Sequence, residues 1–169
     1  PRTDAADVLA AALPAFLRHA TDRAILPPLA RLARICNAKL PAADALWPAL
    51  HDAVLHSDRD IVLAALHLLE RATTSRFNVF TLLVDVETTP LEVATVTARN
   101  VKLRHAQREA LKAGADSVQI EALIRYALGT LKLNFKPVWR ETRTTLVALA
   151  TQHGPAVWRA SFDELTAPR

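Results

Sequence analysis

The chain has 169 residues, of which 51% are hydrophobic, and it contains three glycines, one cysteine and no methionine. A single cysteine excludes an internal disulfide framework, and so few glycines argue against an architecture rich in tight turns. The net charge of +4 is unevenly distributed, because residues 99–143 hold 10 basic and 4 acidic side chains, a local charge of +6. The middle of the chain is therefore where an acidic partner would bind.

Hydrophobic residues recur every three or four positions along most of the chain, which is typical of amphipathic helices. Residues that cap helices, together with prolines and glycines, divide this pattern into about nine segments. In chain order, we expect helices at residues 4–19, 25–36, 45–56, 61–71, 77–86, 88–113, 116–133, 137–153 and 156–165. The sequence thus predicts an all-α fold.

Residues 77–86 are the ambiguous segment, because their Phe, Val and Leu side chains would also suit a β-strand. An isolated strand would have no partner in an otherwise helical chain. We therefore predict a helix here.

The spacing of the predicted helices suggests a repeat, because successive pairs recur at roughly the 40-residue scale of HEAT and armadillo units. Residues 45–52 and 156–163 also share Ala, Trp, Ala and Asp at equivalent positions. We expect residues 1–169 to form one HEAT/armadillo-like α-solenoid segment of antiparallel helix pairs, each covering its neighbours. Since the chain opens on Pro1 and lacks methionine, we expect it to be an internal fragment of a larger protein.

Residues 125–139 are predicted to form the end of one helix, a turn at residues 134–136 and the start of another helix. Pro137 suits the second start, because the first helical turn does not need the N–H that proline lacks. We predict that Phe135 and Trp139 are buried between these two antiparallel helices.

Catalytic and metal-binding motifs are missing from the sequence. The six histidines follow no metal-binding spacing, and no glycine-rich phosphate loop, nucleophile elbow or Walker-type lysine occurs. Acidic pairs such as Asp58 with Asp60 fall at predicted helix ends, where helix capping accounts for them. We expect a non-catalytic protein with no metal, cofactor or small-molecule substrate. No hydrophobic run reaches the length of a membrane helix, so we expect no membrane partner.

Basic side chains are concentrated on the helix predicted at residues 88–113. The candidate RNA- or partner-binding residues are Arg99, Lys102, Arg104, Arg108 and Lys112. Three of them, Arg104, Arg108 and Lys112, are spaced four residues apart and so share one helix face. Such a face suits nucleic-acid phosphates or an acidic protein, and a solvated face without a partner is the alternative. We predict that the whole group faces outward.

A more specific pattern covers residues 84–165. The sequences VETTPL at 86–91 and RYALGTLKLNFKPVW at 125–139, followed by Val157, Trp158, Phe162 and Leu165, resemble the U3 small nucleolar RNA-associated protein 20 family. These are very large HEAT-repeat proteins of the small-subunit processome, and the core from Gly129 to Trp139 is the specific part of the match.

The resemblance implies a non-catalytic scaffold of the nucleus and nucleolus that helps to assemble the 90S pre-ribosome during pre-rRNA processing. Its partners would be other processome proteins, with pre-rRNA or the U3 small nucleolar RNA as possible contacts. The alternative is a HEAT-type transport or adaptor protein, which would bind a protein cargo.

Overall fold

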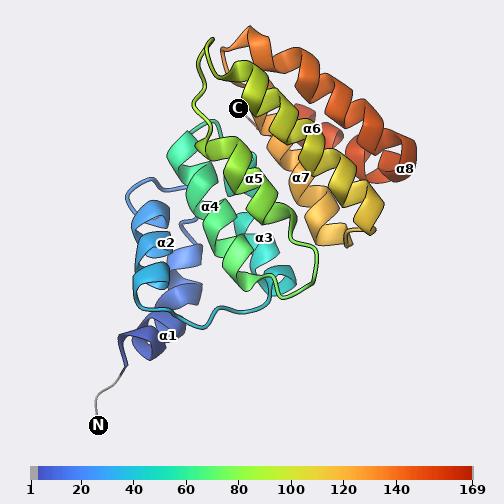
Figure 1. Cartoon of the computed structure of the whole chain (residues 1–169). Coiled ribbons are helices and arrows are strands. Elements are labelled where there is room, and N and C mark those ends of the chain that lie inside the picture. Colours follow the sequence, from blue (N-terminus) through green and yellow to red (C-terminus); the bar gives the residue numbers. More distant parts are fainter. Residues whose placement is uncertain (1–3, 169) are drawn as a thin grey trace.

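The computed structural model describes residues 4–168, which form eight α-helices and one short 3₁₀ helix and contain no strand (Figure 1). The elements are α1 (Ala5–Leu17), α2 (Leu26–Ile35), α3 (Ala43–Val54), α4 (Arg59–Ala72), α5 (Val79–Thr88), α6 (Val96–Ala113), α7 (Ser117–Leu131), the 3₁₀ helix η1 (Lys136–Val138) and α8 (Trp139–Thr166). The prediction of an all-α fold is confirmed.

Polar side chains fix several of the helix starts by accepting hydrogen bonds from otherwise unpaired backbone N–H groups. Asp4, Asp58, Asn78 and Asp116 cap α1, α4, α5 and α7 in this way. Gly114 ends α6 in the left-handed conformation, with φ of 62°, which glycine adopts without the steric cost of a Cβ atom.

The ambiguous segment is helical, so the prediction for residues 77–86 is confirmed in type. In α5, Val79, Phe80, Leu83 and Val86 form one fully buried face. This spacing of three and four residues buries a helix face and would leave a strand half exposed.

The predicted start of α6 was wrong. Helix α6 begins at Val96 and not near residue 88, because residues 89–95 form bends and turns in which the Thr95 hydroxyl donates to the Pro90 carbonyl. The predicted break between the last two helices is confirmed, since the stretch labelled α8 consists of two helical parts that meet at a kink, where His153 departs from helical geometry with φ of −127° and ψ of 38°. Pro155 lies two residues further on, and proline is a usual cause of such kinks.

The helices pack in two rows (Figure 1). In one row α2 packs against α4, α4 against α5 and α5 against α6, while in the other α3 packs against α7 and α7 against α8. Contacts of α3 with α4 and of α6 with α8 join the rows, and α1 packs on α2 at the N-terminal end. The core lies between the rows and is made mainly of leucine and alanine.

The predicted hairpin is present, with η1 and Pro137 between α7 and α8. Phe135 and Trp139 are half-buried, however, so the prediction that both are buried was wrong. The indole N–H of Trp139 donates to the Leu133 carbonyl over 3.0 Å. Because this carbonyl belongs to the turn, the bond holds the indole at the edge of the helix–helix interface and not inside it.

Candidate functional site

The basic residues that the sequence singles out do not form one surface. Arg104, Arg108 and Lys112 are exposed along α6, whereas Lys102 is half-exposed and Arg99 is buried. Arg99 and the buried Leu103 are four residues apart and share one face of α6. The three exposed residues lie on a different face of the same helix.

Arg104 is engaged by an acidic residue of the neighbouring helix. Its Nε and Nη2 atoms donate to the two carboxylate oxygens of Glu141 in α8, over 2.9 and 2.7 Å. The hydrogen bond and the negative charge of Glu141 raise the pKa of Arg104 above its ordinary value. Arg104 therefore links α6 to α8 and is less available to a partner than its exposure suggests.

Arg108 and Lys112 remain as a free cationic pair. Within residues 4–168 neither has an acidic oxygen within 4.0 Å. One helical turn separates them, so both charges lie on the same side of α6. This pair, named the α6 pair below, is the part of the predicted surface that is open to phosphates or acidic side chains.

Lys102 also has partners within the chain. Its Nζ lies 2.8 Å from Asp85 Oδ1 and donates to the Thr89 hydroxyl over 2.9 Å. These contacts tie α6 to the end of α5.

Arg99 corrects the prediction of an outward-facing group, because its side chain is only 2% exposed. It lies four residues before Leu103 on the buried face of α6. Its Nη2 donates to Glu87 Oε2 over 3.2 Å and to the Tyr126 hydroxyl over 2.9 Å. Because Arg99 is buried and bonded to these two residues, it presents no donor to solvent. It therefore stabilises the fold and does not contact a partner.

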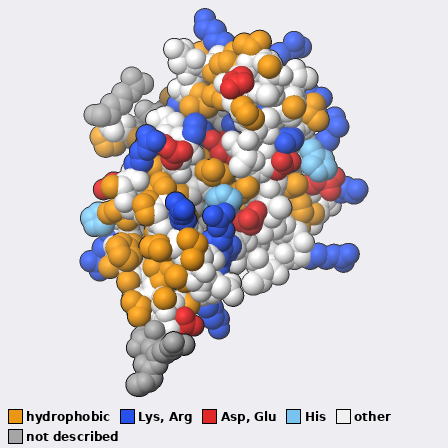
Figure 2. All heavy atoms as spheres, turned by 60° about the vertical axis from the view of Figure 1, so that its left-hand side comes forward, with side chains coloured by type: hydrophobic (Ala, Val, Ile, Leu, Met, Phe, Trp, Pro, Cys, Tyr) orange, Lys and Arg blue, Asp and Glu red, His pale blue; other side chains and the backbone are white. Residues whose placement is uncertain are grey.

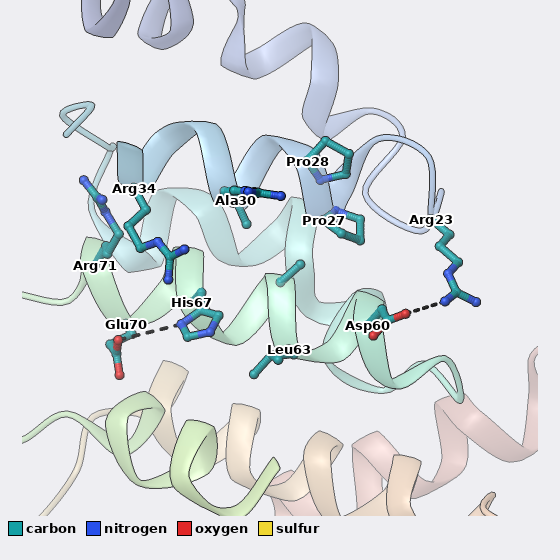
Figure 3. A pocket seen from close by; sticks show the side chains of 12 residues that line it. Arg23, Pro27, Pro28, Ala30, Arg34, Asp60, Leu63, His67, Glu70 and Arg71 are labelled. Atoms are coloured by element: carbon teal, nitrogen blue, oxygen red, sulfur yellow. Dashed lines mark hydrogen bonds and ion pairs between the residues drawn. The ribbon is translucent and has the colours of Figure 1, made fainter. Parts of the chain in front are cut away.

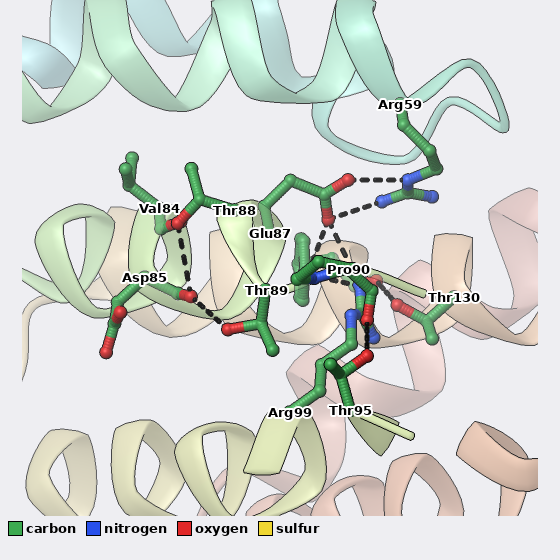
Figure 4. Close-up of polar contacts among 11 residues, drawn as sticks. Arg59, Val84, Asp85, Glu87, Thr88, Thr89, Pro90, Thr95, Arg99 and Thr130 are labelled. Carbon is green, nitrogen blue, oxygen red and sulfur yellow. Dashed lines mark hydrogen bonds and ion pairs between the residues drawn. The ribbon is translucent and has the colours of Figure 1, made fainter. Parts of the chain in front are cut away.

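Glu87 is the centre of a buried polar network (Figure 4). Its carboxylate accepts two hydrogen bonds from Arg59, over 2.7 and 2.9 Å, and one from the Tyr126 hydroxyl over 2.7 Å. With Arg99, these residues come from α4, α5, α6 and α7. Four helices are thus fastened at one carboxylate that is 5% exposed.

The electrostatics of this network follow from burial and from the single negative charge. Burial raises the pKa of Tyr126, and the charge of Glu87 raises it further, outweighing the opposite effect of Arg99. For Arg59, burial lowers the pKa, but the hydrogen bond and charge of Glu87 raise it above its ordinary value. The network therefore keeps a neutral phenol and charged guanidinium groups around one carboxylate. In the described chain, none of its four residues lines the groove between α2 and α4 or the one beside Gly114.

Tyr126 makes the stability of the fold sensitive to alkaline pH. The unfolded chain releases the phenolic proton near pH 10, whereas the folded chain retains it, so Tyr126 contributes stability below pH 10 that is progressively lost above it. Replacing Tyr126 with phenylalanine is expected to cost about 1.5–3 kcal/mol at pH 7, as for hydrogen bonds to charged groups. Denaturant unfolding between pH 8 and 11 should show a flatter alkaline decline for Tyr126→Phe than for the wild type. Parallel declines would contradict this assignment.

Among the described residues, exposed large hydrophobic side chains gather in two places, while Val93, Val101 and Val147 are exposed singly elsewhere. At the N-terminal end they are Val8 and Phe16 of α1 and Leu32 and Ile35 of α2; in the last turns of α8 they are Trp158, Phe162 and Leu165. The rings of Trp158 and Phe162 stack with their centres 6.3 Å apart. Apolar groups gathered in this way mark surfaces that another chain or segment covers.

A groove between α2 and α4 was not predicted from the sequence (Figure 3). It has a volume of about 670 Å³ and combines proline, alanine and leucine side chains with several arginines. Its residues come from α2 with the loop before it and from α4, which are separated in sequence. No local sequence motif therefore predicts the groove.

Within residues 4–168, no group of three or more His, Cys, Asp or Glu side chains is placed to hold a metal ion. Across the same residues, every helix is too short or too polar to span a bilayer. Comparisons with protein-family models, with curated proteins and with solved structures found no significant match to this chain.

Proposed function

We propose that this chain is a segment of a non-catalytic helical-repeat scaffold, an α-solenoid whose stack continues beyond both ends. The observation that carries the proposal is the pair of uncovered apolar faces, on α1 and α2 and on the last turns of α8. In a stacked array each unit buries its face against the next, so an isolated segment leaves hydrophobic side chains exposed at its ends.

The packing of the helices supports a stack in its N-terminal half. Helix α2 packs on α4, two helices further along the chain, and α3 pairs with α4. The stack is irregular further on. Helix α3 packs against α7, whereas α4, α5 and α6 follow one another in the other row. We interpret the extra helix in that row as an insertion into the repeat.

The setting that we propose is small ribosomal subunit biogenesis in the nucleolus, with other processome proteins as partners and pre-rRNA or U3 small nucleolar RNA as an RNA contact. Its support is the likeness of residues 125–139 to the U3 small nucleolar RNA-associated protein 20 family. In that run Gly129 approaches the backbone of Leu55 and Thr130 is fully buried, so these two residues of the motif act in packing. The RNA contact is assigned to the α6 pair, because Lys102 and Arg104 are engaged by acidic residues within the chain.

The experiment that tests the RNA contact replaces Arg108 and Lys112 together with glutamate. Arg104 is left intact, because a glutamate there would face Glu141 and disturb the packing of α6 on α8. Binding of pre-rRNA fragments is measured by filter binding across a salt series. We expect weaker binding, and a salt slope lower by about one unit for each phosphate contact that is lost.

A matched control replaces Arg18 and Lys39 together with glutamate. These two residues are likewise exposed and have no acidic partner in the described chain. Both double variants change the net charge by the same amount, so the control separates a local contact from a general loss of positive charge. Equal weakening by the two variants would contradict a site on α6. An unchanged affinity in the first variant would favour the alternative, a transport or adaptor protein, to which the exposed Trp158 and Phe162 offer an apolar surface for a protein cargo.

A further inference from the structure

The groove between α2 and α4 has an apolar floor and charged ends. It is lined by Pro27, Pro28 and Ala30 of α2 and by Leu63 and Ala64 of α4. Figure 3 shows Arg34, Arg71, His67 and Glu70 at one end, and Arg23 with Asp60 at the other. A volume of about 670 Å³ has room for several apolar side chains of a partner.

The arginines of the groove outnumber its acids. Arg23 is neutralised by Asp58 and Asp60, at 3.7 and 2.5 Å, and Glu70 lies 4.0 Å from His67. Arg31 and Arg34 have no ion pair or side-chain hydrogen bond in residues 4–168.

Arg71 adds a third guanidinium without an acidic partner in the described chain, since it donates only to the Asn37 side chain and to the Ala38 carbonyl. The groove therefore holds three guanidinium groups beside an apolar floor, and no carboxylate of the described residues pairs with them.

The surface around the groove is hydrophobic as well. Figure 2 shows hydrophobic side chains gathered at the N-terminal end of the molecule, with basic side chains and a histidine among them. Such a mixture of apolar groups and arginine is the composition of protein interfaces.

We infer that this groove binds an acidic amphipathic helix of a partner protein, with leucine-like side chains on the floor and carboxylates against Arg31, Arg34 and Arg71. The charge complementarity selects an acidic occupant, and the apolar floor selects one with a hydrophobic face, as when a helix lies in a groove. RNA fits less well, because the groove has no Phe, Tyr or Trp on which a base could stack. The inference rests on the groove alone and is independent of the ribosomal setting proposed above.

The test measures binding of a fluorescein-labelled synthetic peptide to the full chain by fluorescence anisotropy. The peptide is an amphipathic helix with glutamate on one face and leucine on the other, and a second peptide carries lysine at each glutamate position. We expect saturable binding of the acidic peptide only. Arg31→Glu with Arg34→Glu should weaken it by about tenfold or more, and Leu63→Ala should weaken it independently of salt.

Two controls keep the result interpretable. The variant with Arg108→Glu and Lys112→Glu changes the net charge equally on another surface and should bind the peptide like the wild type. Arg31→Gln with Arg34→Gln avoids introducing new charges, so its loss of binding, with an unchanged circular dichroism spectrum, excludes misfolding as the cause.

Three outcomes would overturn the inference. They are absence of saturable binding to the folded wild type, equal weakening by the groove pair and the α6 pair, and displacement of the acidic peptide by oligouridylate in a manner that depends on Arg31 and Arg34. The last outcome would assign the groove to RNA.

Discussion

Replacing Glu87 with glutamine is expected to lower the free energy of unfolding by about 3–5 kcal/mol, the usual cost of breaking a buried ion pair by removing one partner. Glutamine has nearly the same shape but no charge, so Arg99, at 2% exposure, would remain buried without its counter-charge, and Arg59 would lose its ion pair. The Tyr126 hydroxyl would lose its charged acceptor as well. Chemical denaturation followed by circular dichroism measures the effect.

Asp85→Asn is the matched control for this prediction. It removes the same charge from the same helix, two residues away, but Asp85 is 59% exposed and pairs with the half-exposed Lys102. Exposed ion pairs contribute about 0–1 kcal/mol, so the control should unfold almost like the wild type. If both variants lost the same small amount, the network around Glu87 would not fasten the four helices as described.

The second large effect is expected from Gly129→Ala, although alanine is the better helix former by about 1 kcal/mol. A Cβ atom at Gly129 would lie 2.7 Å from the carbonyl oxygen of Leu55 and 3.0 Å from its carbonyl carbon. Both are backbone atoms at the end of α3, so relief requires α7 and α3 to move apart. We expect a net destabilisation of about 1–3 kcal/mol, as for overpacked cores.

Gly154→Ala tests the same substitution without the clash. Gly154 lies at the kink of α8, next to His153, and a Cβ atom there would meet nothing within 4 Å. We expect thermal unfolding of Gly154→Ala at or slightly above the wild-type temperature, and of Gly129→Ala clearly below it. An unchanged midpoint for Gly129→Ala would mean that α3 and α7 are less closely packed than the structure has them.

Most of the secondary structure was predictable from the sequence, because it depends on local signals. Asp4, Asp116 and Gly114 mark helix ends by caps that any reader of the chain can find. The start of α6 was missed because the bond from Thr95 to Pro90 builds a turn where the sequence has only a proline. The order in which helices pack depends on contacts between distant residues and was beyond local patterns.

The candidate site illustrates the same limit. Spacing placed Arg104, Arg108 and Lys112 on one face correctly, but charge alone also included Arg99. The signal that was overlooked is the distance of four residues from Arg99 to the buried Leu103. Its partners Glu87 and Tyr126 lie 12 and 27 residues away, so the ion pair itself could not be read from the sequence. The groove between α2 and α4 was missed for the same reason.

Recovery of the bound RNA tests most directly the proposal that the chain is a non-catalytic scaffold segment of small-subunit assembly. The protein is tagged in its own cells, cross-linked with ultraviolet light and purified, and the attached RNA is sequenced. We expect enrichment of pre-rRNA or U3 small nucleolar RNA and co-sedimentation with pre-ribosomal particles. Recovery of a protein cargo without such RNA, from fractions free of pre-ribosomes, would contradict it.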